Sequence, residues 1–180
     1  MSHAEYVAAE AKSDVRHEYL RGEIYAMAGG TLEHAALAAA LASEIRTALQ
    51  GKPCRVFSAD ARVRIEATDL TTYPDVSVVC EELLRDPRDD HAMLNPIVVC
   101  EVLSESTEAY DRGAKASHFR HIPSLREYVL VSQTDQRVEV QRRNAGGHWE
   151  IHEFGPGEQV LLESLGIAIP LNALYRNPLK

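Results

Sequence analysis

The chain has 180 residues and is 45% hydrophobic, which is enough for one domain with a substantial core and excludes a disordered chain. The net charge of −8 disfavours avid, nonspecific nucleic-acid binding, but it does not exclude a nuclease, because metal-binding carboxylates are themselves acidic. No apolar run approaches the roughly 18 residues of a membrane helix, and the N-terminus lacks the pattern of a signal peptide. We therefore expect one cytoplasmic domain over residues 1–180, with no membrane partner.

The first half of the chain predicts a short helix, a hairpin and a long helix. Two β-prone stretches flank Arg21-Gly22, a plausible turn, within residues 17–27. A helix should follow, with Thr31 as its N-terminal cap and Gly51 beyond its end. Its apolar residues recur every four positions and predict one buried stripe made of Leu37, Leu41, Ile45 and Leu49.

Strand patterns dominate the rest of the chain. Residues 73–80 and 96–103 are apolar on both faces, which is typical of the middle of a covered sheet. Residues 81–95 between them are polar and predict an exposed loop. A helical pattern follows, then three strands in a meander, and last a short strand with a terminal helical turn. The predicted fold class is α/β (α+β), with a mixed sheet flanked by helices.

The three cysteines, Cys54, Cys80 and Cys100, each lie in or beside an apolar run. No two of them form a C-x-x-C motif, so the spacing does not indicate a zinc site. We expect three buried, reduced thiols.

Two carboxylates occupy unusual positions for acidic residues. Asp75 begins one of the central strands, and Glu101 lies inside the other. A carboxylate in an apolar strand is costly to bury unless it is paired, and two on neighbouring strands can meet at about 5 Å. Such a pair would suit Mg²⁺ or Mn²⁺. The alternative for each is a side chain that points to solvent or forms its own salt bridge.

Four further residues are candidates for the same site. Lys115 follows Asp111 by four positions on a predicted helix, a spacing that is also typical of an ordinary surface ion pair. His34 opens the long helix, Glu44 lies on its polar side and Glu18 lies in the hairpin. Each of these three is a candidate supporting ligand, and for each the alternative is a structural or solvated role.

The order and spacing of the motifs PDVSVV, EVLSEST, DRGAK and PSLREYVLV resemble the Uma2 (DUF820) family of the PD-(D/E)XK nuclease-like superfamily. This resemblance covers about residues 5–175 and implies a restriction-endonuclease-like fold. It also implies that Asp75 and Glu101 are the two metal-binding acids. The superfamily's usual lysine position is Leu103 here, and the family resembles nucleases in which the lysine has moved to the following helix, at Lys115. Phe119 stands where the family often has tyrosine.

The resemblance implies a Mg²⁺- or Mn²⁺-dependent endonuclease that hydrolyses phosphodiester bonds in DNA, with Asp75, Glu101 and Lys115 as catalytic residues. Two alternatives are a catalytically inactive nucleic-acid-binding or protein-interaction module on the same fold, and a hydrolase of a smaller phosphate ester. Since relatives of this fold commonly pair, a homodimer that cuts both strands is also an expectation.

Overall fold

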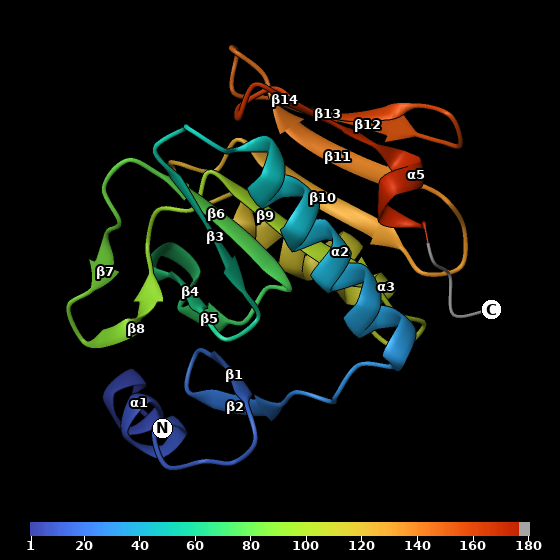
Figure 1. Ribbon diagram of the computed structural model, residues 1–180. Coiled ribbons are helices and arrows are strands. Elements are labelled where there is room, and N and C mark those ends of the chain that lie inside the picture. Colours follow the sequence, from blue (N-terminus) through green and yellow to red (C-terminus); the bar gives the residue numbers. More distant parts are fainter. Residues whose placement is uncertain (177–180) are drawn as a thin grey trace.

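The computed structural model describes residues 1–176, which form two mixed six-stranded sheets, a small hairpin and several helices (Figure 1). The predicted fold class is confirmed, although the sequence indicated one sheet rather than two. None of the helices within this described part is long and apolar enough to cross a membrane.

The N-terminal segment folds as the sequence predicts. Helix α1 (His3–Glu10) is followed by strands β1 (His17–Leu20) and β2 (Glu23–Ala26), which pair as a hairpin. The two turn residues, Arg21 and Gly22, have φ angles of 49° and 94°, as a tight two-residue hairpin turn requires. In Figure 1 this hairpin and α1 lie together at one end of the molecule.

The long helix α2 (Leu32–Ala48) begins and ends where the sequence predicts. The Thr31 side chain caps it by accepting a 3.2 Å hydrogen bond from the His34 N–H. Of the predicted stripe, Leu41, Ile45 and Leu49 are buried and Leu37 is half-buried. The helix lies across one face of the central sheet (Figure 1), which buries this stripe.

The central sheet has the strand order β12-β11-β10-β9-β6-β3. Strands β9 and β10 run parallel, and the other neighbours are antiparallel. Every residue of β9 is buried, because apolar clusters cover both faces of the sheet. The strands are β3 (Cys54–Ser58), β6 (Val76–Cys80), β9 (Val98–Leu103), β10 (Glu127–Ser132), β11 (Val138–Arg143) and β12 (Trp149–Phe154).

The second sheet has the order β2-β1-β5-β4-β8-β7. Residues 81–95 are largely exposed, as predicted, but they are not a loop, because they contain the paired strands β7 and β8. The side chains of Asp86 and Asp89 are buried, and Asp89 pairs with Arg62 at 3.0 Å. These acids hold the segment inward because they are matched by buried arginines, a pairing that periodicity does not show. The remaining strands are β4 (Arg62–Ile65), β5 (Leu70–Thr72), β7 (Arg85–Asp86) and β8 (Asp89–Met93), with a 3₁₀ turn at Glu66–Thr68.

The segment after β9 is helical, as predicted, but it contains a π-helical turn. The described part closes with the hairpin of β13 and β14 and the short helix α5. The predicted short strand and helical turn correspond to β14 and α5, and β13 is an additional strand paired with β14. The bounds are α3 (Glu108–Tyr110), the π-helical turn (Asp111–Lys115), α4 (Ala116–Phe119), β13 (Gln159–Leu162), β14 (Ile167–Pro170) and α5 (Leu171–Leu174).

The expectation of three reduced cysteines was wrong. Cys54 and Cys80 lie directly opposite each other on β3 and β6, and their sulfurs form a disulfide. Cys100 remains a free, buried thiol. The sequence did not reveal the pair because 26 residues separate the two cysteines and only the strand register makes them neighbours.

Candidate active site

Asp75 and Glu101 lie on the same face of the central sheet. Val76 pairs with Cys100, so extending the antiparallel register by one residue places Asp75 opposite Glu101. Asp75 Oδ2 accepts a 2.7 Å hydrogen bond from the backbone N–H of Val102, which fixes this carboxylate against β9. The two strands therefore bring together two acids that are 26 positions apart in the sequence.

Glu101 is 4% exposed, and it is the more deeply buried of the two acids. Its neighbours in β9, Cys100 and Val102, point to the opposite face and pack in the core beneath α2. Burial raises the pKa of the Glu101 carboxyl well above its usual range; Lys115 opposes this rise and Asp75 adds to it. Keeping this carboxylate ionised therefore depends on nearby positive charge.

Lys115 supplies that charge from the π-helical turn after β9. Its ammonium lies 2.8 Å from Glu101 Oε1, 3.5 Å from Asp111 Oδ1 and 3.7 Å from Glu18 Oε1. Burial by itself lowers the pKa of Lys115, but the charges of Glu101, Glu18 and Asp111 outweigh burial and raise it above its usual value. The interpretation of Lys115 as a surface ion-pair partner is wrong, since the side chain is only 5% exposed.

Glu18 completes the cluster from the second sheet. Its carboxylate accepts hydrogen bonds from the hydroxyls of Thr72 and Tyr110, the latter at 3.2 Å. Tyr110 thus brings a phenol to the site, although the family position that often holds tyrosine is Phe119 here, and that ring lies in the core. The candidate site is therefore formed between the two sheets.

His34 and Glu44 both lie on α2, but only His34 reaches the acids. His34 Nε2 is 3.1 Å from Asp75 Oδ2, and this hydrogen bond raises the pKa of the imidazole. Glu44 lies 3.9 Å from Arg176 and lines a cavity of about 970 Å³ whose lining includes none of the acids of the candidate site. The expectation that Glu44 supports the site is thus not met by the geometry.

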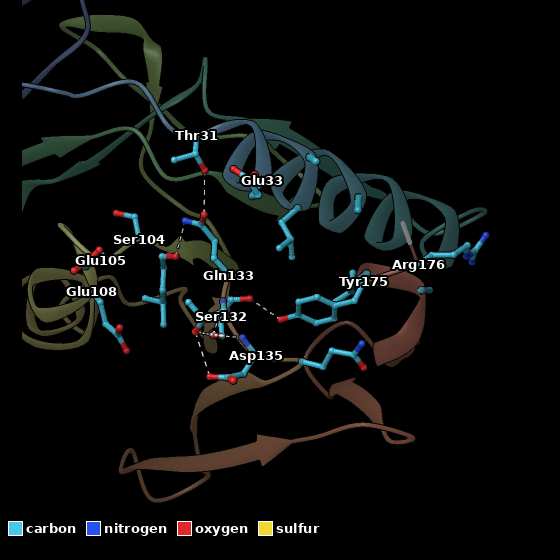
Figure 2. A pocket seen from close by; sticks show the side chains of 18 of the residues that line it. Thr31, Glu33, Ser104, Glu105, Glu108, Ser132, Gln133, Asp135, Tyr175 and Arg176 are labelled. Carbon is cyan, nitrogen blue, oxygen red and sulfur yellow. Dashed lines mark hydrogen bonds between the residues drawn. The ribbon is translucent and has the colours of Figure 1, made fainter. Parts of the chain in front are cut away.

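Figure 2 shows the cavity that Glu44 lines, which lies beside α2, the β10–β11 turn and α5, away from the candidate site. Gln133 lines this cavity. Its side-chain carbonyl accepts a 3.1 Å hydrogen bond from Thr31 Oγ1, and its amide donates a 2.8 Å hydrogen bond to the Leu103 carbonyl (Figure 2). Gln133 therefore links the cap of α2 to the end of β9.

Sequence reasoning missed three contributors to the site. Asp111 was considered only as a surface partner of Lys115, and Tyr110 and Thr72 were not considered. The π-helical turn brings Asp111 inward, where the Tyr128 hydroxyl donates to its carbonyl at 3.0 Å. No residue pattern predicts a π-helical turn. If Lys115 had been predicted to be buried, its ammonium would have been expected to contact more than one acidic side chain.

Comparison with known proteins identifies the family to which the chain is similar. Residues 3–172 match the family model Uma2, described as "Putative restriction endonuclease". The chain is 36% identical over 176 residues to the uncharacterized protein slr1290 of Synechocystis sp., covering 98% of this chain and 92% of that protein. It is 31% identical over 160 residues to a second Synechocystis protein, sll1609, covering 89% and 90% of the two chains.

A solved structure shares the fold. The crystal structure of a putative nuclease belonging to DUF820 from Anabaena variabilis superposes with a TM-score of 0.77. Its sequence is 19% identical, and the match covers 96% of this chain and 97% of the other. At this identity the likeness establishes the architecture of the chain.

Proposed function

The chain belongs to the Uma2 family, and from that premise we propose that it is a Mg²⁺-dependent endonuclease that hydrolyses phosphodiester bonds in DNA. The observation that carries this proposal is the 2.8 Å contact between the Lys115 ammonium and Glu101, on the sheet face that Asp75 shares. A buried lysine beside two strand-borne acids is an expensive arrangement for stability alone, because every ion in it loses its hydration. A catalytic role for these three side chains readily explains why such an arrangement is present.

The donor set fits a hard divalent cation. Asp75, Glu101 and Glu18 offer carboxylate oxygens, the ligands that Mg²⁺ and Mn²⁺ prefer. With Asp111 the site holds four acids against one lysine, so negative charge is in excess there. Within residues 1–176, however, no three His, Cys, Asp or Glu side chains gather as a ready metal-binding group. A single ion held by Asp75 and Glu101 is the arrangement we propose.

When bound, such an ion would activate a water molecule and neutralise charge on the phosphate. The protein's own residues supply the rest. Lys115 holds a positive charge where the phosphate becomes more negative. The Val102 N–H and His34 orient Asp75, and Thr72 and Tyr110 orient Glu18. A homodimer would place two such sites on one duplex.

The test is a cleavage assay on supercoiled plasmid, single-stranded DNA and RNA, with Mg²⁺, Mn²⁺ or EDTA. We expect plasmid nicking with either metal and none in EDTA. Glu101→Gln and Lys115→Met should each reduce the rate by at least about 100-fold, the scale seen when a transition-state charge stabiliser is lost. Glu105→Gln is the matched control, because Glu105 is exposed and four residues from Glu101.

Two results would contradict the proposal. One is folded wild-type protein that cuts no substrate with any metal, which would favour the inactive binding module. The other is full activity in both Glu101→Gln and Lys115→Met.

A further inference from the structure

Tyr25 is an exposed aromatic residue that borders the candidate site. It lies in β2, the edge strand of the second sheet, and 50% of its surface is exposed. Tyr25 pairs directly with Glu18 in the antiparallel register. Directly opposite residues share one face, with Cβ atoms about 4.5–5.5 Å apart. Tyr25 therefore lies on the same face of the hairpin as Glu18, whose carboxylate contacts Lys115.

One end of this ring is anchored. The Tyr25 hydroxyl donates a 2.8 Å hydrogen bond to Glu23, which lies two residues earlier on the same strand and so on the same face. Ile24, between them, points to the opposite face. The anchored phenol makes Tyr25 less free than an ordinary surface tyrosine, which lowers the entropy that binding against its ring would cost.

Charge limits how nucleic acid can approach this site. The protein has a net charge of −8, and Glu18, Glu101 and Asp111 surround the single ammonium of Lys115. Binding of a phosphate backbone through many basic contacts is therefore weak here. Stacking of a base on an aromatic ring depends little on net charge and requires a base that is not already stacked in a duplex.

We propose that Tyr25 is a stacking platform for an unpaired nucleobase beside the scissile phosphodiester, so that the preferred substrates are single-stranded or contain unpaired bases. This inference rests on the proposed function and specifies its substrate class. The ring would hold the base on the β2 side of Glu18, and the neighbouring phosphodiester would then face the acids and Lys115.

The first test measures binding, with Ca²⁺ replacing Mg²⁺ to suppress cleavage. Fluorescein-labelled oligothymidylate, oligouridylate and a mixed-sequence DNA duplex of equal length are titrated with protein and followed by fluorescence anisotropy. We expect both single strands to bind more tightly than the duplex. Tyr25→Ala should weaken single-strand binding by at least about fivefold, the lower end of the effect of removing a stacking residue.

Three variants separate stacking from other roles of β2. Tyr25→Trp and Tyr25→Phe should both bind single strands more tightly than Tyr25→Ala, since both retain an aromatic face. Tyr25→Phe should bind only slightly less tightly than the wild type, because it lacks only the bond to Glu23. Ile24→Ala is the matched control on the other face of the same strand and should also bind normally. Loss of binding in Tyr25→Phe would assign the effect to the hydroxyl and overturn the stacking role.

Other outcomes also overturn the inference. One is that Tyr25→Ala binds single strands as tightly as the wild type, and another is that the wild type binds the duplex more tightly than single strands. A third is that the wild type sediments as a dimer and that both Tyr25→Ala and Ile24→Ala sediment as monomers. The last would make β2 an interface between two copies. If binding is unaffected by Tyr25→Ala while metal-dependent plasmid cleavage persists, stacking fails and the proposed function stands. If stacking is observed but no metal supports cleavage, the proposed function fails instead.

Discussion

Replacing Lys115 by methionine tests whether its ammonium is what permits the buried acids to coexist. Methionine keeps most of the apolar stem and removes the charge, so the change leaves little cavity. Glu101, at 4% exposure, would then face Asp111 and Asp75 without the cation that now lies 2.8 Å away. The variant therefore isolates the electrostatic contribution of Lys115.

The expected loss of stability is large. Removing one partner of a buried ion pair typically costs about 3–5 kcal/mol, because the other charge is left uncompensated. For a chain of this size, each kcal/mol lowers Tm by about 2–4 °C, so Lys115→Met should melt about 6–20 °C below the wild type at neutral pH. Lys12→Met, on the exposed surface near α1, should change Tm little.

The loss should depend on pH. Burial already raises the pKa values of Glu101 and Asp111 in the folded protein, and Lys115 opposes both increases. A carboxyl with a raised pKa in the folded state contributes stability below its unfolded pKa and loses it as pH rises through the folded pKa. Without Lys115 the folded pKa values rise further, so the Tm gap between variant and wild type should be widest near pH 8 and narrow towards about pH 5.

The assay is thermal unfolding by circular dichroism across this pH range, with EDTA present so that no cation substitutes for the ammonium. Equal melting temperatures for Lys115→Met and Lys12→Met near pH 8 would refute the reasoning. A Tm difference between Lys115→Met and the wild type that widened as pH fell would refute the attribution of its pH dependence to Glu101 and Asp111.

Two further predictions concern the features that the sequence concealed. In denaturant without reductant, a thiol reagent should detect one cysteine, Cys100, and detection of three reactive thiols would contradict the disulfide. Cys54→Ser should lower the free energy of unfolding by roughly 3–4 kcal/mol, because the disulfide closes a loop between cysteines 26 positions apart. Asp89→Asn should lower the free energy of unfolding in urea by about 3–5 kcal/mol, because it leaves Arg62 buried without its charged partner, whereas Asp90→Asn at the exposed neighbouring position should change it little. Equal effects of the two substitutions would mean that the Arg62–Asp89 pair does not hold residues 81–95 in place.

The sequence by itself determined the elements whose signals are local. The i, i+4 stripe ending at Leu49, the Thr31 cap and the Arg21-Gly22 turn each reflect contacts within a few residues, and all three appear in the structure. The apolar residues around Asp75 and Glu101 also predicted two central strands, because apolar residues on both faces mark a covered sheet. In the structure Glu101 lies within β9 and Asp75 directly precedes β6.

Only the tertiary structure decided which side chains meet. Strand register joins Cys54 to Cys80 and brings Asp75 opposite Glu101, and a one-residue slip would reverse the facing of each side chain. The π-helical turn directs Lys115 towards Glu101 and Glu18, whereas its i, i+4 spacing to Asp111 had fitted a surface pair equally well. His34 contacts Asp75, whereas Glu44 on the same helix lines a cavity outside the candidate site. The rotation of α2 about its axis and its orientation on the sheet determine which residues each side chain can contact. These contacts depend on long-range packing, which a linear pattern of residue types does not encode.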